Sequence, residues 1–323
     1  MIKNSQWRIP VILFFVTLVT TTVTGMNYAG VNLNQWYQGL FFSIPLLLIL
    51  LTHEMGHYIA ARKHNIDVSP PYFIPLPPPF GLGTLGAVIK IREPISKPSA
   101  LIDVGAAGPL SGLIVAVIVL IIGISMSDVS SIPLEREHQL MTEGNSILYI
   151  SLKFFIKGEY LPSGNRDLMM HPVAFAGWIG LLITMINLIP IGQLDGGHIA
   201  HGWFGNKYNK FSTLLHKFLP VFGTVIASFI AFDTYVRMKF RVLLLSGNIN
   251  GGISFADAFF SGLNAAAPWF VWPLVIYILS KLSGGISHPP VNNEPLKHRN
   301  KVTVTVILVI FIIIFMPVPM RMT

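Results

Sequence analysis

The sequence predicts an all-α, polytopic membrane protein with about seven transmembrane helices (six to eight) and one small membrane-reentrant strand-and-loop segment near residues 81–92. Of the 323 residues, 52% are hydrophobic and 11% are charged, whereas about a quarter of a soluble domain is charged. The apolar residues also occur in long blocks that approach the ~20 residues a helix needs to cross ~30 Å of hydrocarbon. A soluble core helix seldom stays apolar on every face for this length.

The expected spans follow the apolar blocks in chain order. Lys3 and Arg8 precede the first block, and no clear small-residue cleavage site follows it, so we expect an uncleaved first span. We interpret 1–323 as one membrane-embedded domain with its catalytic core at about 38–200. The core spans are 38–61, 101–125 and 172–190, and the accessory spans are 9–25, 214–235, 265–282 and 302–320.

The stretch 68–98 is not expected to span the membrane. Its first part is rich in proline, at a density that excludes a regular helix. The glycine-rich segment 81–91 follows, and the alternation from Thr84 to Ile91 predicts a small hairpin or looped strand. At membrane depth, such backbone is stable only where it is buried in protein or lines a wet cavity. The polar loop 126–170 is too short to be a separate folded module.

Charge and cysteine content exclude several classes of function. The formal charge is +8, but the basic residues flank spans and form no stripe with interleaved aromatic residues, so we expect no nucleic-acid partner. The chain has no cysteine, which excludes disulfides, thiolate zinc sites and a cysteine nucleophile.

Lysine and arginine clusters predict the orientation. The clusters at the chain start and after the second, fourth and sixth spans share one side, which we assign to the cytoplasm. A further cluster, Arg237, Lys239 and Arg241, falls on the other side. Either the fifth span ends elsewhere or an extra pass exists within 236–264, and the sequence leaves both alternatives open.

An HExxH motif, His53 to His57, lies near the end of the second span. Residues four apart share one helix face, so both imidazoles can bind one zinc ion, with Glu54 placed as the general base for a zinc-activated water. HExxH also occurs by chance. Ionisable groups inside a span, however, cost about 2.5–3.5 kcal/mol each and are usually functional, and a metal explains all three side chains together.

A hydrolytic zinc site needs a third protein ligand, and Asp195 is the best candidate. It closes the fourth span, which runs in the same direction as the second, so both motifs reach the same side of the membrane. Without the HExxH motif, a helix cap or Asx turn would be the favoured interpretation of Asp195, and with the motif a zinc ligand is favoured. His198 and His201 are rival ligands, and His64 is expected to be an ordinary polar flank.

These residues resemble the site-2 proteases, a family of intramembrane zinc metalloproteases. The resemblance rests on HEMGH at 53–57, on NLIPIGQLDGGH at 187–198, and on GAAGP at 105–109. The resemblance covers about 40–198 and, more faintly, 288–299. Within it, the stretch 171–198 is similar to the plant-chloroplast and bacterial branch of the family, which lacks a PDZ domain. The family often has arginine where this chain has His198.

The resemblance implies hydrolysis of a peptide bond within or near a transmembrane helix of a membrane-protein substrate. It implies one Zn²⁺ per chain, bound by His53, His57 and Asp195, with Glu54 as the general base. It also implies a reentrant strand that pairs with an unwound substrate. The implied substrate-binding residues are Asn187, Gly83, Thr84 and Gly86.

Two other functions stay open: a metal transporter whose His and Asp side chains mark an ion path, and a catalytically silent homologue that acts as a binding scaffold. We expect a multi-pass protein of a prokaryotic cell membrane, with the active site toward the cytoplasm and the lipid bilayer and a transmembrane substrate as partners. The sequence leaves the substrate, the trigger and the oligomeric state open.

Overall fold

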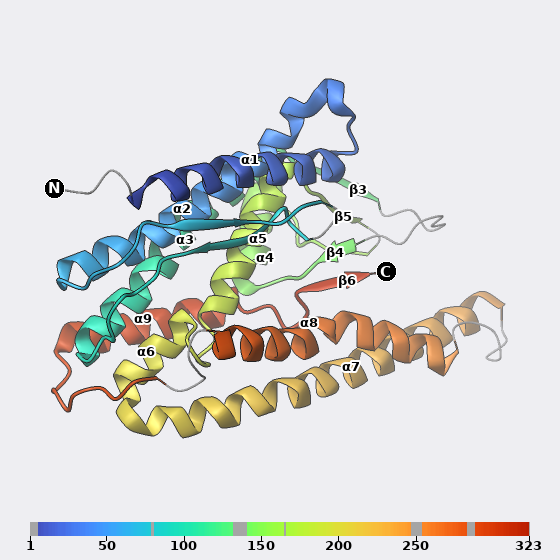
Figure 1. Cartoon of the computed structure of the whole chain (residues 1–323). Coiled ribbons are helices and arrows are strands. Elements are labelled where there is room, and N and C mark those ends of the chain that lie inside the picture. Colours follow the sequence, from blue (N-terminus) through green and yellow to red (C-terminus); the bar gives the residue numbers. More distant parts are fainter. Residues whose placement is uncertain are drawn as a thin grey trace.

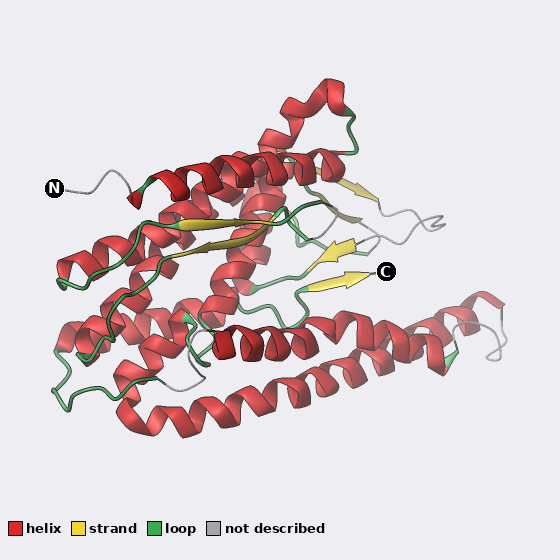
Figure 2. Cartoon of the chain, in the orientation of Figure 1, coloured by secondary structure: helices red, strands yellow, loops and turns green. Residues whose placement is uncertain are grey.

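The chain folds as a bundle of helices with three small strand pairs (Figures 1 and 2). The computed structural model describes residues 6–78, 81–131, 141–164, 166–246, 254–282 and 288–322. The helices are α1 (Arg8–Ala29), α2 (Leu40–Lys63), α3 (Pro98–Met126), α4 (Ile147–Lys157), α5 (Pro172–Asn187), α6 (Asp195–Phe204), α7 (Tyr208–Ser246), α8 (Phe255–Leu282) and α9 (His298–Ile314), with short 3-10 helices η2 (Leu33–Gly39) and η3 (Gly205–Lys207).

The strands form three antiparallel pairs. These are β1 (Tyr72–Pro75) with β2 (Thr84–Val88), β3 (Asp128–Ser131) with β5 (Arg166–Met169), and β4 (Met141–Glu143) with β6 (Met320–Met322). The last two pairs join the described parts of the polar loop 126–170 to each other and to the C-terminal end of the chain (Figure 2).

Within the described ranges, five stretches are long and apolar enough to cross a membrane. Four of them contain the expected spans 9–25, 38–61, 101–125 and 214–235, and the fifth covers most of the expected span 265–282. They are Arg8–Ala29, Leu33–Lys63, Pro98–Met126, Asp195–Leu244 and Phe255–Ile278. These findings support a polytopic membrane protein, and the count of seven spans stays a prediction.

The two other expected spans correspond to shorter apolar helices. The span expected at 172–190 is α5, which has 16 residues and ends at Asn187, because the chain turns through Pro190 before α6 begins. The span expected at 302–320 is α9, which has 17 residues. It ends ahead of Pro317 and Pro319, and the strand β6 follows.

The fifth expected span is longer than the sequence suggested. α7 is one helix of 39 residues that packs against α8 as an antiparallel hairpin (Figure 1). Arg237 and Lys239 therefore lie on α7 itself, which favours the alternative that the fifth span ends later in the chain. Residues 247–253, where an extra pass would have to begin, lie outside the described residues.

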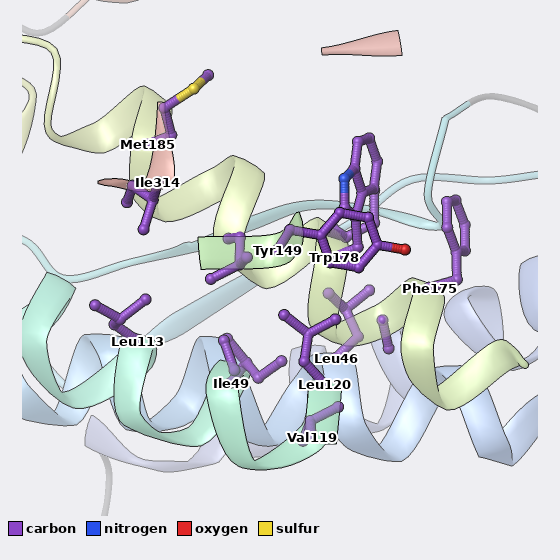
Figure 3. Close-up of a cluster of buried hydrophobic side chains, with 14 of the residues drawn as sticks. Leu46, Ile49, Leu113, Val119, Leu120, Tyr149, Phe175, Trp178, Met185 and Ile314 are labelled. Atoms are coloured by element: carbon purple, nitrogen blue, oxygen red, sulfur yellow. The ribbon is translucent and has the colours of Figure 1, made fainter. Parts of the chain in front are cut away.

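The hydrophobic core lies between α2, α3 and α5, and α4 closes it (Figure 3). Leu46 of α2, Leu120 of α3 and Trp178 of α5 are fully buried in it. The indole N–H of Trp178 donates a hydrogen bond to the carbonyl oxygen of Gly144 at 2.8 Å, so the polar end of this large side chain is satisfied. This packing fixes α2 relative to α5, and these two helices lead to the candidate site.

The segment near 81–92 contains one strand, β2, as the alternation predicted, and its entry into the membrane stays a prediction. Strand β2 pairs with β1, which lies inside the proline-rich stretch where the sequence indicated only irregular backbone. The hairpin lies against α1 (Figure 1). The hydroxyl of Thr20 on α1 donates a hydrogen bond to the carbonyl oxygen of Gly83 at 2.6 Å, and this contact ties the turn of the hairpin to a membrane helix.

A buried ion cluster joins α4 to the strands around it. The side chain of Lys153 is fully buried, and its ammonium lies 3.9 Å from Glu143 Oε1 and 3.8 Å from Asp167 Oδ1. The ammonium also lies 4.5 Å from the centre of the Tyr149 ring. Burial lowers the pKa of Lys153 and raises the pKa of Glu143, because a low-dielectric interior disfavours both charged forms.

We expect Lys153→Met to lower the free energy of unfolding by about 3–5 kcal/mol, because Glu143 and Asp167 then stay buried without their cation. Chemical unfolding in detergent measures this change. The matched control is Lys157→Met, one turn further along α4, whose ammonium contacts the Ser125 carbonyl oxygen at an exposed position. Its expected effect is within about 0.5 kcal/mol, and equal stability of the two variants would contradict the buried-cation interpretation.

Candidate metal centre

Helix α2 carries the HExxH motif into the interior of the bundle. His53, Glu54 and His57 are buried, with 5%, 7% and 6% of their surface exposed. The two imidazoles lie one helical turn apart, and their Nε2 atoms are 3.1 Å from each other. Two ring nitrogens at this distance face the same point, as the spacing of the motif predicts.

Asp195 meets these imidazoles from α6. Its Oδ2 lies 3.2 Å from His53 Nε2 and its Oδ1 lies 3.2 Å from His57 Nε2. Among the described residues, these three form the group that can hold a metal ion, with ligand atoms within 4.8 Å of one another. Two imidazoles and one carboxylate fit a zinc ion and leave a position for a fourth ligand.

The turn after α5 determines where Asp195 points. The N-cap position of α6 is Leu194, so Asp195 is the first helical residue rather than the cap, and its carboxylate faces the imidazoles. A Cβ atom on Gly196 or Gly197 would overlap the carbonyl oxygens of Leu188 and Gly192. The two glycines therefore let the turn fold back tightly onto the start of α6.

One face of α3 gives the ligands room. Gly105, Gly108 and Gly112 lie at helical spacing along this face, and a Cβ at each would meet the ligand residues or their neighbours. At Gly108 it would overlap the His57 ring, and at Gly112 it would lie 3.0 Å from His53 Cβ. The sequence resemblance covered the first two positions and missed Gly112, although its spacing from Gly105 and Gly108 marks the same face.

The same helix orients one of the imidazoles. His57 Nδ1 donates a hydrogen bond to the carbonyl oxygen of Val104 at 2.7 Å. Because a carbonyl oxygen only accepts, Nδ1 carries the proton, and the lone pair of Nε2 is directed at the ligand group.

The rival ligands do not join this group. His201 Nε2 donates to the carbonyl oxygen of Pro289 at 3.0 Å, and the His198 ring packs against the His288 ring, with centroids 4.8 Å apart. His64, expected to be an ordinary polar flank, instead pairs with Asp103, at 3.0 Å. No local sequence pattern marks this pair, because its members are far apart in the chain.

The residues implied to bind substrate border the centre or its hairpin. Asn187, the last residue of α5, places Nδ2 3.4 Å from His53 Nε2. Thr84 is buried, and its hydroxyl donates to the Ile74 carbonyl oxygen and accepts from the Gly86 N–H, each at 2.9 Å. Gly83 is held against α1. Past the end of β2, the backbone of Ile89 lies near the Glu54 carboxylate, a proximity that sequence reasoning missed.

The fold and the site together define a class: membrane metallopeptidases with an HExxH helix and an aspartate from a later helix. Residues 41–230 match the model of peptidase family M50. The chain belongs to this family, which is the family of the site-2 proteases.

Plant proteins named as zinc metalloproteases are among its relatives. The chain is 33% identical over 179 residues to "Probable zinc metalloprotease EGY2, chloroplastic" of Oryza sativa subsp. indica, which covers 55% of this chain and 32% of that protein. It is 31% identical over 205 residues to "Probable zinc metalloprotease EGY1, chloroplastic" of Arabidopsis thaliana, which covers 61% of this chain and 32% of that protein. The chain thus matches about a third of the length of these relatives.

We expect Gly108→Ala to weaken zinc binding about tenfold or more, because the added methyl group displaces the His57 ring. Zinc content after dialysis against a competing chelator measures this. Gly112→Ala is the graded comparison, because its methyl group meets the carbon atom of His53 at a distance that a small shift relieves, so its loss should be smaller. Zinc retention by Gly108→Ala at the unmodified level would contradict the assigned position of His57.

Proposed function

We propose that this chain is an intramembrane zinc metalloprotease that hydrolyses a peptide bond within or near a transmembrane helix of a membrane-protein substrate. The observation that carries the proposal is the convergence of His53, His57 and Asp195, with Glu54 beside them, within apolar helices. The metalloprotease names of the relatives support it.

In this proposal, His53, His57 and Asp195 hold one zinc ion. When bound, zinc acts as a Lewis acid that polarises a carbonyl and makes water nucleophilic at neutral pH. Glu54 accepts the proton of the attacking water and passes it to the leaving amine, because it is the free carboxylate on the same helix turn. Asn187 donates a hydrogen bond from Nδ2 to the oxygen on which negative charge develops.

The hairpin supplies a means to hold an unwound substrate. β1 faces α1, and β2 forms the other edge of a two-stranded sheet. Leu85 and Val88 on β2 are 69% and 49% exposed, which suits a strand that receives another extended chain. A segment paired with β2 would pass Ile89 and reach Glu54. Gly83, Thr84 and Gly86 shape the start of this edge, and residues that weaken a substrate helix should favour cleavage.

The protein's location follows partly from these findings. Five apolar helices support a membrane protein, and we propose the lipid bilayer and a membrane-protein substrate as its partners. The proposal places the metal centre nearer the side that bears most basic clusters, which we take as the cytoplasmic side. The relatives are chloroplast proteins of plants, so they do not support the assignment to a prokaryotic cell membrane.

We expect Glu54→Gln to abolish cleavage of a membrane-spanning model substrate while about one zinc per chain stays bound, because an amide cannot accept the proton of water. Cleavage in proteoliposomes and metal analysis measure both properties. Asp195→Ala should lose zinc, and His201→Ala, the rival position on the same helix, should keep it. Full cleavage by Glu54→Gln would contradict the mechanism, and metal flux without hydrolysis would indicate a transporter instead. Zinc binding by the unmodified chain without hydrolysis or flux would indicate a silent scaffold.

We expect Asn187→Ala to lower kcat about 10²- to 10³-fold with zinc content unchanged, the usual loss when one oxyanion donor is removed. Single-turnover cleavage of the same substrate measures the rate. Asn206→Ala serves as a control, because Asn206 contacts only the backbone of residue 291 among its described hydrogen bonds, away from the ligand group. A rate unchanged by Asn187→Ala would remove this residue from the reaction.

A further inference from the structure

A segment between α8 and α9 lies against the turn that leads into Asp195. We call residues 288–300 the C-terminal strap (Figure 1, beside α6), and its last three residues begin α9. The strap is far from the HExxH and Asp195 motifs in sequence, yet it contacts α6, α7 and α3. Its first residue, His288, is 7% exposed, and nothing in the proposed reaction uses it.

His288 is held in place by its own backbone. Its N–H donates to Asn209 Oδ1 at 3.0 Å, and Asn209 Nδ2 donates to its carbonyl oxygen at 3.3 Å. The Asn209 side chain, which comes from α7, therefore hydrogen-bonds the peptide groups on both sides of the His288 Cα. With the backbone fixed, the imidazole points to a defined place, and Nε2 donates to the carbonyl oxygen of Gly192 at 2.6 Å. Because that oxygen only accepts, Nε2 carries the proton.

Gly192 lies three residues before Asp195, in the turn between α5 and α6. Its φ of +54° is in the left-handed region that favours glycine. Its N–H donates to the Ser212 hydroxyl at 2.9 Å, and the Tyr208 hydroxyl lies 3.5 Å from its carbonyl oxygen. The short bond from His288 is the closest of these contacts. The orientation of this peptide group sets the path of the chain into Asp195.

The other end of the strap reaches α3, the helix that orients His57. Arg299 forms an ion pair with Asp103 of α3, and Asn300 Nδ2 donates to Asp103 Oδ1 at 3.2 Å. Asp103 directly precedes Val104, whose carbonyl oxygen orients His57. The strap therefore spans the supports of two of the three ligands, Asp195 at one end and His57 at the other.

We infer that His288 is a positioning residue of the metal centre: through its hydrogen bond to the Gly192 carbonyl oxygen it fixes the turn that presents Asp195 to zinc. The inference rests on the proposed function in one respect, namely that Asp195 is a zinc ligand. Groups that orient a ligand typically change metal affinity 10- to 100-fold when they are removed. His288 acts through the backbone rather than on the carboxylate, so the lower end, about tenfold, is expected.

The test compares three variants of the full chain in detergent. His288→Phe keeps a planar ring but removes the donor. His288→Gln keeps one, because the Gln amide nitrogen lies about as far along the side chain as Nε2. His298→Gln is the matched control, an exposed histidine on the same strap. The zinc dissociation constant is measured by competition with a chelator, and the thermal midpoint of the zinc-free protein is measured in parallel.

We expect His288→Phe to bind zinc about tenfold more weakly, His288→Gln to recover most of the affinity, and His298→Gln to match the unmodified chain. The zinc-free midpoints should agree among all four proteins. Unchanged zinc affinity in His288→Phe would overturn the inference. So would an equal loss in His288→Phe and His288→Gln accompanied by a lower zinc-free midpoint, because that pattern indicates a purely structural role.

Failure of the inference is distinguishable from failure of the proposed function. If the unmodified chain binds no zinc, or if Asp195→Ala binds it as tightly, the ligand assignment itself is wrong. If zinc binding depends on Asp195 and is indifferent to His288→Phe, the metal centre stands and the positioning role alone is rejected.

Discussion

The structure depends on one electrostatic constraint, the placement of the Asp195 carboxylate against two imidazoles inside apolar helices. An ionised carboxylate in such surroundings is costly unless a cation or hydrogen-bond donors compensate it. His53 and His57 present ring nitrogens to both of its oxygens at 3.2 Å, an arrangement in which a divalent cation balances the charge better than the imidazoles do alone. The close approach of α2, α3 and α6 follows from this requirement.

That close approach is obtained by leaving out side chains. Along α3, glycines stand wherever a ligand ring lies against the helix, and at the start of α6 two glycines admit the carbonyl oxygens of the preceding turn. Between membrane helices, small residues matter more than in soluble proteins, because lipid is as apolar as the core and association relies on van der Waals contact. The glycines thus serve helix packing and ligand geometry at once. The motif glycines around the ligands are needed because a larger side chain would not fit there.

The sequence predicted the parts of the site that obey a local period. His53 and His57 follow from helical spacing, and Asp195 followed from the direction of the spans together with the resemblance. It did not predict contacts between residues remote in the chain, such as Asp103 with Arg299 or Gly192 with His288, because no local pattern marks them. Helix ends were also missed where tertiary contacts decide them. α5 stops at Asn187 because the next residues form the turn that leads into Asp195. Hydropathy alone does not predict where this turn begins.

In the proposed mechanism, the hairpin and the metal centre act together on the substrate. A peptide bond in a helix is held by its own hydrogen bonds and is shielded by neighbouring turns. A substrate helix therefore has to open, and the backbone groups it exposes need new partners in an environment with little water. An edge such as β2 supplies these partners. Ile89, which continues the chain beyond this edge, lies near the Glu54 carboxylate. The register of a paired substrate would then fix which of its peptide bonds lies beside the general base.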